Sequence, residues 1–192
     1  MASKSEARSG LQAGDGRLSE AQQAGGGPRV GVVLGSDSDL PRMQPCLDTL
    51  AEFGVDSELR VLSAHRVPED VAEYGRSAAG RGVQVLIAGA GLAAHLPGIL
   101  AAYTTLPVIG VPLAVGPLGG LDALYSVVQM PPGVPVATVA VDGARNAAVL
   151  ATQILAVGDL ALRLKLHQFK QRLAEQVRRK DQALADRGGS KA

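Results

Sequence analysis

Residues 83–98 read VQVLIAGAGLAAHLPG, and this stretch decides the fold. Its first six residues form an apolar run of strand length, which predicts a buried β-strand over 83–88. The glycines and alanines of 89–94 predict a loop whose backbone can approach a ligand closely. A helix is predicted over 96–103, because Pro97 is tolerated in the first turn of a helix. The stretch is therefore expected to be a buried strand, a small-residue loop and a helix.

The same alternation extends along the chain in both directions. The predicted strands are 30–34, 55–62, 83–88, 107–111 and 136–141, and the predicted helices are 40–53 (with Gly54 as its C-cap), 71–79, 96–103, 121–129, 144–157 and 159–185. Strands that alternate with helices indicate βαβ units and a parallel sheet covered on both faces. Near-continuous apolar strands are typical of such a sheet. The expected fold class is α/β: a three-layer sandwich with a central parallel sheet of about five strands, flavodoxin-like, followed by a long C-terminal helix.

Composition divides the chain into three regions. Residues 1–28 are rich in Gly, Ala, Ser and Gln and have no apolar period, so we expect a disordered tail. Residues 29–158 hold seven basic and eleven acidic residues and form the predicted catalytic α/β domain. Residues 159–192 hold nine basic and four acidic residues and form a predicted helical arm and tail. The basic arm is read as a solvated helix face rather than a nucleic-acid contact.

Composition and charge also exclude several classes of protein. Aromatic residues make up only 3% of the chain and the net charge is +1, which argues against both base-stacking platforms and a basic surface for duplex DNA. The single cysteine, Cys46, excludes an intrachain disulfide and a multi-cysteine metal site. No apolar run reaches the roughly 18 residues of a membrane span, and the N-terminus lacks the apolar segment of a secretory signal. We expect a cytoplasmic protein that binds neither nucleic acid nor membrane.

Ligands of parallel α/β sheets bind beyond the carboxyl ends of the strands, so the loops after the strands hold the candidate site. The first loop, GSDSD at 35–39, offers hydroxyl groups and a helix N-terminus that suit a phosphate. Ser36 could donate to the phosphate and Asp39 could accept from sugar hydroxyls. Simple N-capping by the same residues is the alternative.

Two further loops add a cation and two histidines. In SAHR at 63–66, Arg66 can bind a phosphate with its planar fork, and His65 suits proton transfer at neutral pH. In the loop after 83–88, Gly91 allows close backbone approach and His95 opens the next helix. Each loop alone could be an ordinary turn. Three loops with polar or small residues suited to a ligand follow three consecutive parallel strands. They indicate one site, because all three reach the same edge of the sheet.

Together these loops resemble those of the PurE family of purine biosynthesis, which includes mutases and carboxylases. The matching stretches are GSDSD at 35–39, SAHR at 63–66, AGAGLAAHLPG at 88–98, PVIGVP at 107–112, LDALYSVVQMPPGVPVATVA at 121–140 and NAAVLATQIL at 146–155. The resemblance covers roughly residues 29–158. Leu92 departs from it, since a glycine is expected at that position.

The resemblance implies a mutase that converts N5-carboxyaminoimidazole ribonucleotide to 4-carboxy-5-aminoimidazole ribonucleotide. By similarity, Ser36 and Arg66 bind the phosphate, Asp39 binds the ribose, and His65 is the general acid and base. Ser63 is a further substrate-binding residue. Gly91 and His95 contribute to the wall of a pocket that traps CO2 between its loss and its return. The resemblance implies no metal and no organic cofactor, because the electron-rich ring is its own nucleophile.

Two other functions remain open at this point. One is an aminoimidazole ribonucleotide carboxylase that takes free CO2, and the other is a non-catalytic nucleotide-binding protein that would not require His65. The resemblance also implies a homo-octamer. The partial apolar stripe of the C-terminal helix fits that expectation, and we expect the stripe to pack on a neighbouring subunit. Its residues are Leu160, Leu164, Phe169, Leu173, Val177 and Leu184.

Overall fold

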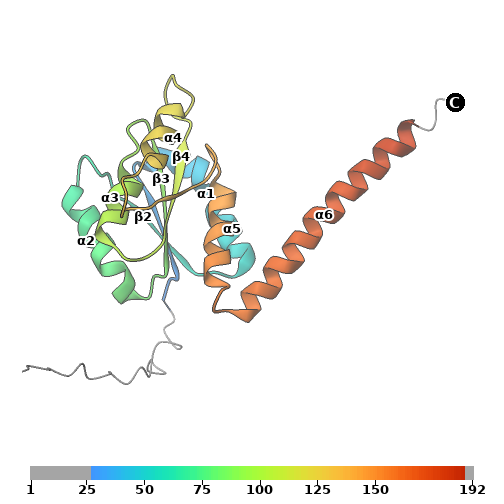
Figure 1. Ribbon diagram of the computed structural model, residues 1–192, viewed down its shortest axis with the longest axis horizontal. Coiled ribbons are helices and arrows are strands. Elements are labelled where there is room, and N and C mark those ends of the chain that lie inside the picture. The colour runs from blue at the N-terminus through green and yellow to red at the C-terminus, as the bar shows by residue number, and fades with distance from the viewer. Residues whose placement is uncertain (1–26, 189–192) are drawn as a thin grey trace, which may run out of the picture.

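The computed structural model describes residues 27–188 and shows a five-stranded, fully parallel sheet in the order β2-β1-β3-β4-β5. The strands are β1 (Val30–Leu34), β2 (Ser57–Val61), β3 (Val85–Gly91), β4 (Val108–Leu113) and β5 (Ala137–Thr138). The predicted fold class is confirmed, including the long C-terminal helix (Figure 1). The predicted tail of residues 1–28 lies outside the described residues except for Gly27 and Pro28.

Helices cover both faces of the sheet (Figure 1). The helices are α1 (Leu40–Phe53), α2 (Pro68–Ala78), α3 (Leu96–Tyr103), α4 (Leu121–Val128), α5 (Ala144–Leu155) and α6 (Leu160–Gly188). One core lies between the sheet and α1, α5 and the start of α6, and the other lies between the sheet and α2, α3 and α4. Successive residues of a strand point to opposite faces, so Val32 enters the first core and Val33 the second. The sequence prediction of Gly54 as the C-cap of α1 is correct, with a φ of +68°.

Three strand predictions need correction. β3 runs to Gly91, so residues 89–91 of the expected loop pair with β4 instead. The edge strand β2 is mostly exposed rather than continuously apolar, because only β1 pairs with it. The expected strand over 136–141 is reduced to Ala137–Thr138, since the chain turns at Asp142 with a φ of +53° before α5 begins.

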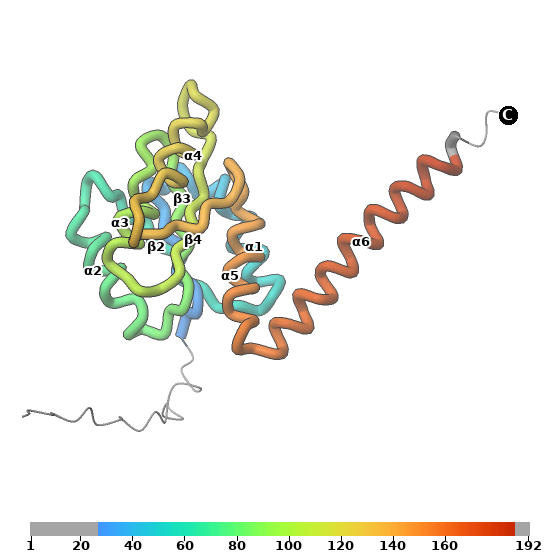
Figure 2. Tube along the Cα trace, viewed as in Figure 1, coloured from blue at the N-terminus to red at the C-terminus, as the bar shows by residue number. Residues whose placement is uncertain are grey.

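The helix α6 divides into an anchored start and a projecting remainder. Figure 2 follows the chain from α5 through a tight turn into α6, which then runs away from the sheet. Leu162, Leu166 and Phe169 are buried against α1 and α5, with the rings of Phe169 and Phe53 5.4 Å apart. Arg172 pairs with Glu52 at 3.1 Å.

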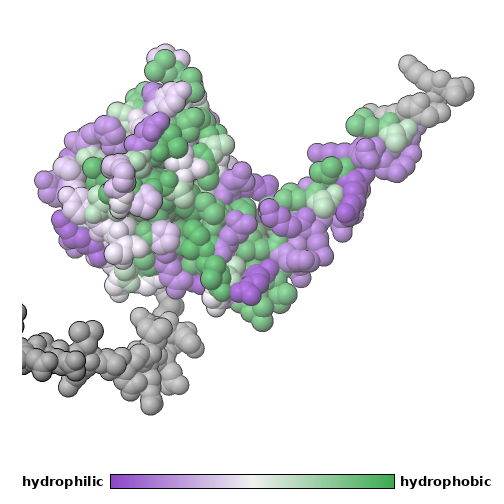
Figure 3. Space-filling model, viewed as in Figure 1, coloured by the Kyte–Doolittle hydropathy of each residue, from purple (hydrophilic) through white to green (hydrophobic). Residues whose placement is uncertain are grey.

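The first three turns of α6 therefore pack on the chain's own domain, and of the predicted stripe Phe169 is corrected to a contact within the domain. The buried residues recur at spacings of four and three, which places them on one helical face toward the chain's own domain. Of the predicted stripe, only Phe169 is buried, and Leu160, Leu164, Leu173, Val177 and Leu184 are exposed. Figure 3 shows apolar side chains among polar ones along the projecting part of the helix.

Candidate functional site

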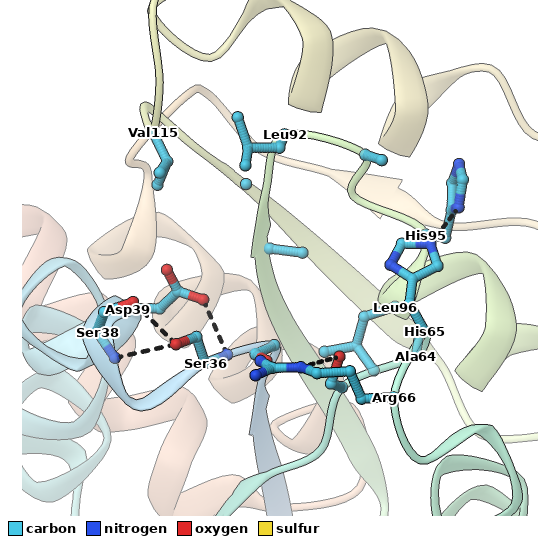
Figure 4. Close-up of a pocket in the computed structure, with 15 residues that line it drawn as sticks. Ser36, Ser38, Asp39, Ala64, His65, Arg66, Leu92, His95, Leu96 and Val115 are labelled. Atoms are coloured by element: carbon cyan, nitrogen blue, oxygen red, sulfur yellow. Dashed lines mark hydrogen bonds between the residues drawn. The ribbon is translucent and has the colours of Figure 1, made fainter.

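A cavity of about 300 Å³ lies at the carboxyl end of the sheet (Figure 4). Its walls come from the loops after β1, β2, β3 and β4. All the residues that the sequence singled out for the site line this cavity: Ser36, Asp39, Ser63, His65, Arg66, Gly91 and His95. The predicted meeting of three loops at one edge of the sheet is therefore what the structure shows.

The loop after β1 is a single turn held by its own side chains. The Ser36 hydroxyl accepts a hydrogen bond from the Ser38 amide at 3.3 Å, while the Asp39 carboxylate accepts one from the Ser36 amide at 3.1 Å. This reciprocal arrangement is a capping box, so the capping alternative raised for these residues is real. The Ser38 hydroxyl also donates to the Ser36 hydroxyl at 2.9 Å. Both hydroxyl groups nevertheless line the cavity, so capping and ligand binding are compatible.

Asp39 is a buried carboxylate at this wall, with only 6% of its surface exposed. Burial raises the pKa of the Asp39 carboxyl, and the hydrogen bond from the Ser36 amide and the nearby Arg42 guanidinium offset part of the rise. In Figure 4 one carboxylate oxygen faces the Ser36 amide and the other is directed away from it. That second oxygen can accept hydrogen bonds from a hydroxyl-bearing ligand.

Arg66 bridges the loops after β1 and β2. Its Nε donates to the Ser63 hydroxyl at 3.2 Å and its Nη2 donates to the Gly35 carbonyl at 3.3 Å. Figure 4 shows the guanidinium pointing toward the Ser36 loop. The arrangement places a permanent positive charge beside hydroxyl donors, which suits a phosphate.

His65 and His95 form a hydrogen-bonded pair across the cavity from Ser36 and Asp39 (Figure 4). The Nε2 atom of His65 lies 2.8 Å from the Nδ1 atom of His95, and the rings meet edge to face with centroids 4.9 Å apart. One ring must donate and the other accept in this contact. The sequence predicted both histidines at the site but not their contact with each other.

The fourth wall comes from the loop after β4, which sequence reasoning missed. Val115 lines the cavity next to Leu92, and Leu92 has a φ of +55°, in the left-handed region where glycine is favoured. The glycine expected at position 92 fits this conformation. A signal for the fourth loop was present, because the glycine-rich residues 114–120 lie shortly after the predicted strand 107–111.

Within residues 27–188, no three His, Cys, Asp or Glu side chains gather as metal ligands. None of the helices in the same range is long and apolar enough to cross a membrane. The single cysteine, Cys46, is buried in the core on α1, where burial raises the pKa of its thiol to about 12.

Fold and site together define an α/β protein with a ligand cavity at the carboxyl end of a parallel sheet. Hydroxyl groups and a guanidinium that suit a phosphate line one side of the cavity, and a pair of imidazoles lines the other. A family model described as AIR carboxylase matches residues 29–176, so the chain belongs to that family. The resemblance to the PurE family drawn from its loops is confirmed.

Relatives agree with this assignment. The N5-carboxyaminoimidazole ribonucleotide mutase of Mycobacterium leprae (strain TN) is 57% identical over 154 residues, covering 80% of this chain and 90% of that one. The mutase of Thermotoga maritima is 51% identical over 161 residues, covering 84% and 94%. The crystal structure of Treponema denticola PurE superposes with a TM-score of 0.75 at 26% identity, covering 82% and 98%.

Proposed function

We propose that this protein is an N5-carboxyaminoimidazole ribonucleotide mutase, an isomerase of purine biosynthesis. It would convert that substrate to 4-carboxy-5-aminoimidazole ribonucleotide. The observation that carries the proposal is that the loops at 35–39, 63–66 and 90–95 all contribute to one cavity in a chain 51–57% identical to proteins named as this mutase.

The two sides of the cavity suit the two ends of such a ribonucleotide. Arg66 and the hydroxyl groups of Ser36 and Ser63 would bind the phosphate, through charge-assisted hydrogen bonds. The free oxygen of Asp39 would accept from the ribose hydroxyls. The imidazole pair lies on the opposite side, where the aminoimidazole ring would be placed (Figure 4).

His65 would move one proton out and back in each turnover. Protonated His65 gives its proton to the exocyclic nitrogen as the nitrogen–carbon bond of the carbamate breaks, which leaves the amine and CO2. The ring carbon C4 then forms a bond to that CO2, and the C4 proton passes to His65. The ring regains its aromaticity and His65 its proton, so atoms and charge balance. A group that must act first as acid and then as base fits a histidine.

His95 and Gly91 would serve this cycle without carrying the proton to substrate. His95 holds the His65 ring through the 2.8 Å contact. Gly91 leaves room for Val115, because an added Cβ at Gly91 would lie 2.8 Å from the Val115 Cβ. Val115 packs over Gly91 and closes the wall at this point, which favours recapture of CO2.

A carboxylase that uses free CO2 is the second candidate, and a non-catalytic nucleotide binder is the third. The names of the 51–57% identical relatives favour the mutase over both. Turnover of synthetic N5-carboxyaminoimidazole ribonucleotide, without added bicarbonate, tests the proposal. Formation of the C4-carboxylated product supports the mutase. Product formed only from aminoimidazole ribonucleotide with bicarbonate would replace it with the carboxylase.

The proposed assembly is a homo-octamer in the cytoplasm. The projecting part of α6 supports an assembly role, since Leu173, Val177 and Leu184 are exposed in the isolated chain. A projecting helix with apolar residues gains stability by burying them against another surface.

A further inference from the structure

Leu92 stands at the cavity in a backbone conformation that leucine rarely adopts. Its φ is +55°, and Leu92 and Asp142 are the two residues other than glycine with positive φ within the described range 27–188. A non-glycine residue in the left-handed region of backbone space costs energy, so the surrounding contacts must hold its conformation. Such residues cluster at functional sites, which points to a role for Leu92 at the cavity. The contacts of its side chain identify that role.

The loops after β3 and β4 interlock through two reciprocal contacts. The Leu92 side chain fills the space above Gly116, where an added Cβ would lie 2.6 Å from the Leu92 Cδ2. The Val115 side chain fills the space above Gly91, where an added Cβ would lie 2.8 Å from the Val115 Cγ2. Each loop therefore offers one branched side chain and one glycine to the other, and both side chains line the cavity (Figure 4).

We propose that Leu92 is a positioning residue that closes the cavity wall between these two loops and so retains CO2 during the reaction. This inference rests on the proposed mutase function. In that reaction the carboxyl group leaves nitrogen as CO2 and must reach C4 before it escapes. CO2 is small and carries no net charge, so it forms no ion pair and its retention depends largely on the wall. Leu92, Val115, Ala90 and Ala93 supply an apolar wall of that kind.

Removal of the Leu92 side chain should let the two loops separate more often. The side chain is 48% exposed, so only part of its surface is buried in the interlock. Loss of that contact should raise the population of the separated arrangement about fivefold, equivalent to about 1 kcal/mol. Escape of CO2 should rise by the same factor, because escape follows the open population.

The experiment measures exchange of CO2 with solvent at initial rate. Unlabelled N5-carboxyaminoimidazole ribonucleotide is converted in buffer that contains 13C-bicarbonate and carbonic anhydrase, and mass spectrometry gives the label in the product. A reaction without protein corrects for spontaneous breakdown of the substrate. The variants are Leu92→Ala, Leu92→Gly and, as a control of similar volume at the same backbone, Leu92→Met. Circular dichroism establishes that each variant is folded.

The expected result is about fivefold more label per product in Leu92→Ala and Leu92→Gly than in wild type, with Leu92→Met unchanged. Equal label in all four proteins would overturn the inference. A rise confined to Leu92→Gly would also overturn it, because Leu92→Ala lacks the same side chain. Wild-type protein that forms no product would instead reject the mutase function, so the two failures are distinguishable.

Discussion

The Nε2 atom of His65 lies 2.8 Å from the Nδ1 atom of His95, although 30 residues separate them in sequence. The contact needs one ring to donate and the other to accept, so at least one of the two imidazoles is neutral in it. The pair fixes the orientation of the His65 ring at the cavity. Proton transfer depends on that orientation, because the transferring atom must lie within hydrogen-bonding reach of the substrate.

Replacement of His65 by asparagine should reduce kcat by about 10²–10⁴-fold while substrate affinity changes little. Asparagine preserves polarity and approximate size but cannot take up the C4 proton. Steady-state turnover and calorimetric binding measure the two effects. His167→Asn is the matched control, since His167 is exposed on α6 away from the cavity. A His65→Asn protein within a few-fold of wild-type turnover would remove His65 from the mechanism.

The hydrogen bond between the two histidines should matter to kcat rather than to substrate affinity. His95→Ala removes the partner that orients His65 and should lower kcat by up to about 10²-fold, the cost of a misplaced reacting group. His95→Asn retains a side-chain amide that can bond to His65, so it should recover part of the loss. Equal losses in both variants would indicate that His95 acts through something other than this bond.

Arg66→Ala should weaken substrate binding about 10–150-fold, the range of a hydrogen bond to a charged group. Arg66→Lys keeps the charge but loses the fork, and it should lie between wild type and Arg66→Ala. Calorimetry measures both dissociation constants. Arg76→Ala is the control, because Arg76 stacks on Tyr103 at 4.6 Å and does not line this cavity. Affinity unchanged in Arg66→Ala would contradict the phosphate role.

Asp39→Asn should stabilise the protein at pH 7 and weaken substrate binding. The pKa of Asp39 is raised above its ordinary value of 3.8, so the folded chain binds this proton more tightly than the unfolded chain. The stabilisation from this group is complete at pH values below the pKa of Asp39 in the unfolded chain. It is lost as the pH rises through the pKa of Asp39 in the folded chain. Asparagine stays neutral throughout, so its advantage over Asp39 should vanish at low pH. Denaturant unfolding across pH 3–7 checks this, and a variant less stable than wild type at pH 7 would contradict it.

Two truncations should separate the two parts of α6. A chain that ends after Arg172 keeps the buried Leu162, Leu166 and Phe169 and should retain its melting temperature, while light scattering should report smaller assemblies than those of the full-length chain. A chain that ends after Val157 should also melt much lower, because each lost side chain contributes about 1.5–3 kcal/mol by burial. If the chain that ends after Arg172 forms the same assembly as the full-length chain, the projecting part of α6 is not needed for assembly.

Much of the fold could be predicted because each element carries its own periodicity. The apolar run at 83–88 indicated a buried central strand, and β3 is the centre of the observed sheet. Edge positions were harder to predict. Residues 57–61 read SELRV, and only the finished sheet shows that β1 alone pairs with them. The expected strand at 136–141 was shortened by the turn at Asp142, whose positive φ leaves no trace in the apolar pattern.

The site could be predicted as residues but not as contacts. The loops after parallel strands converge on one sheet edge, so the convergence of Ser36, Arg66 and His95 follows from topology. The hydrogen bond between His65 and His95 depends on the path of both loops, which no spacing in the sequence specifies. For the same reason, the sequence pointed to a different stripe of α6 from the one that packs on the chain's own domain, and packing of the predicted leucines on a neighbouring subunit stays a prediction. The periodicity of α6 admits more than one stripe, and the contact with Phe53 selects among them.

The interlock of Leu92 with Gly116, and of Val115 with Gly91, couples the substitutions that the two loops accept. Alanine at position 116 would be strained by the φ of +78° whatever residue stands at position 92, and its Cβ would also lie 2.6 Å from the Leu92 Cδ2. A smaller residue at position 92 would relieve that contact but not the backbone strain. The two positions are therefore epistatic, and their substitutions should be strongly non-additive.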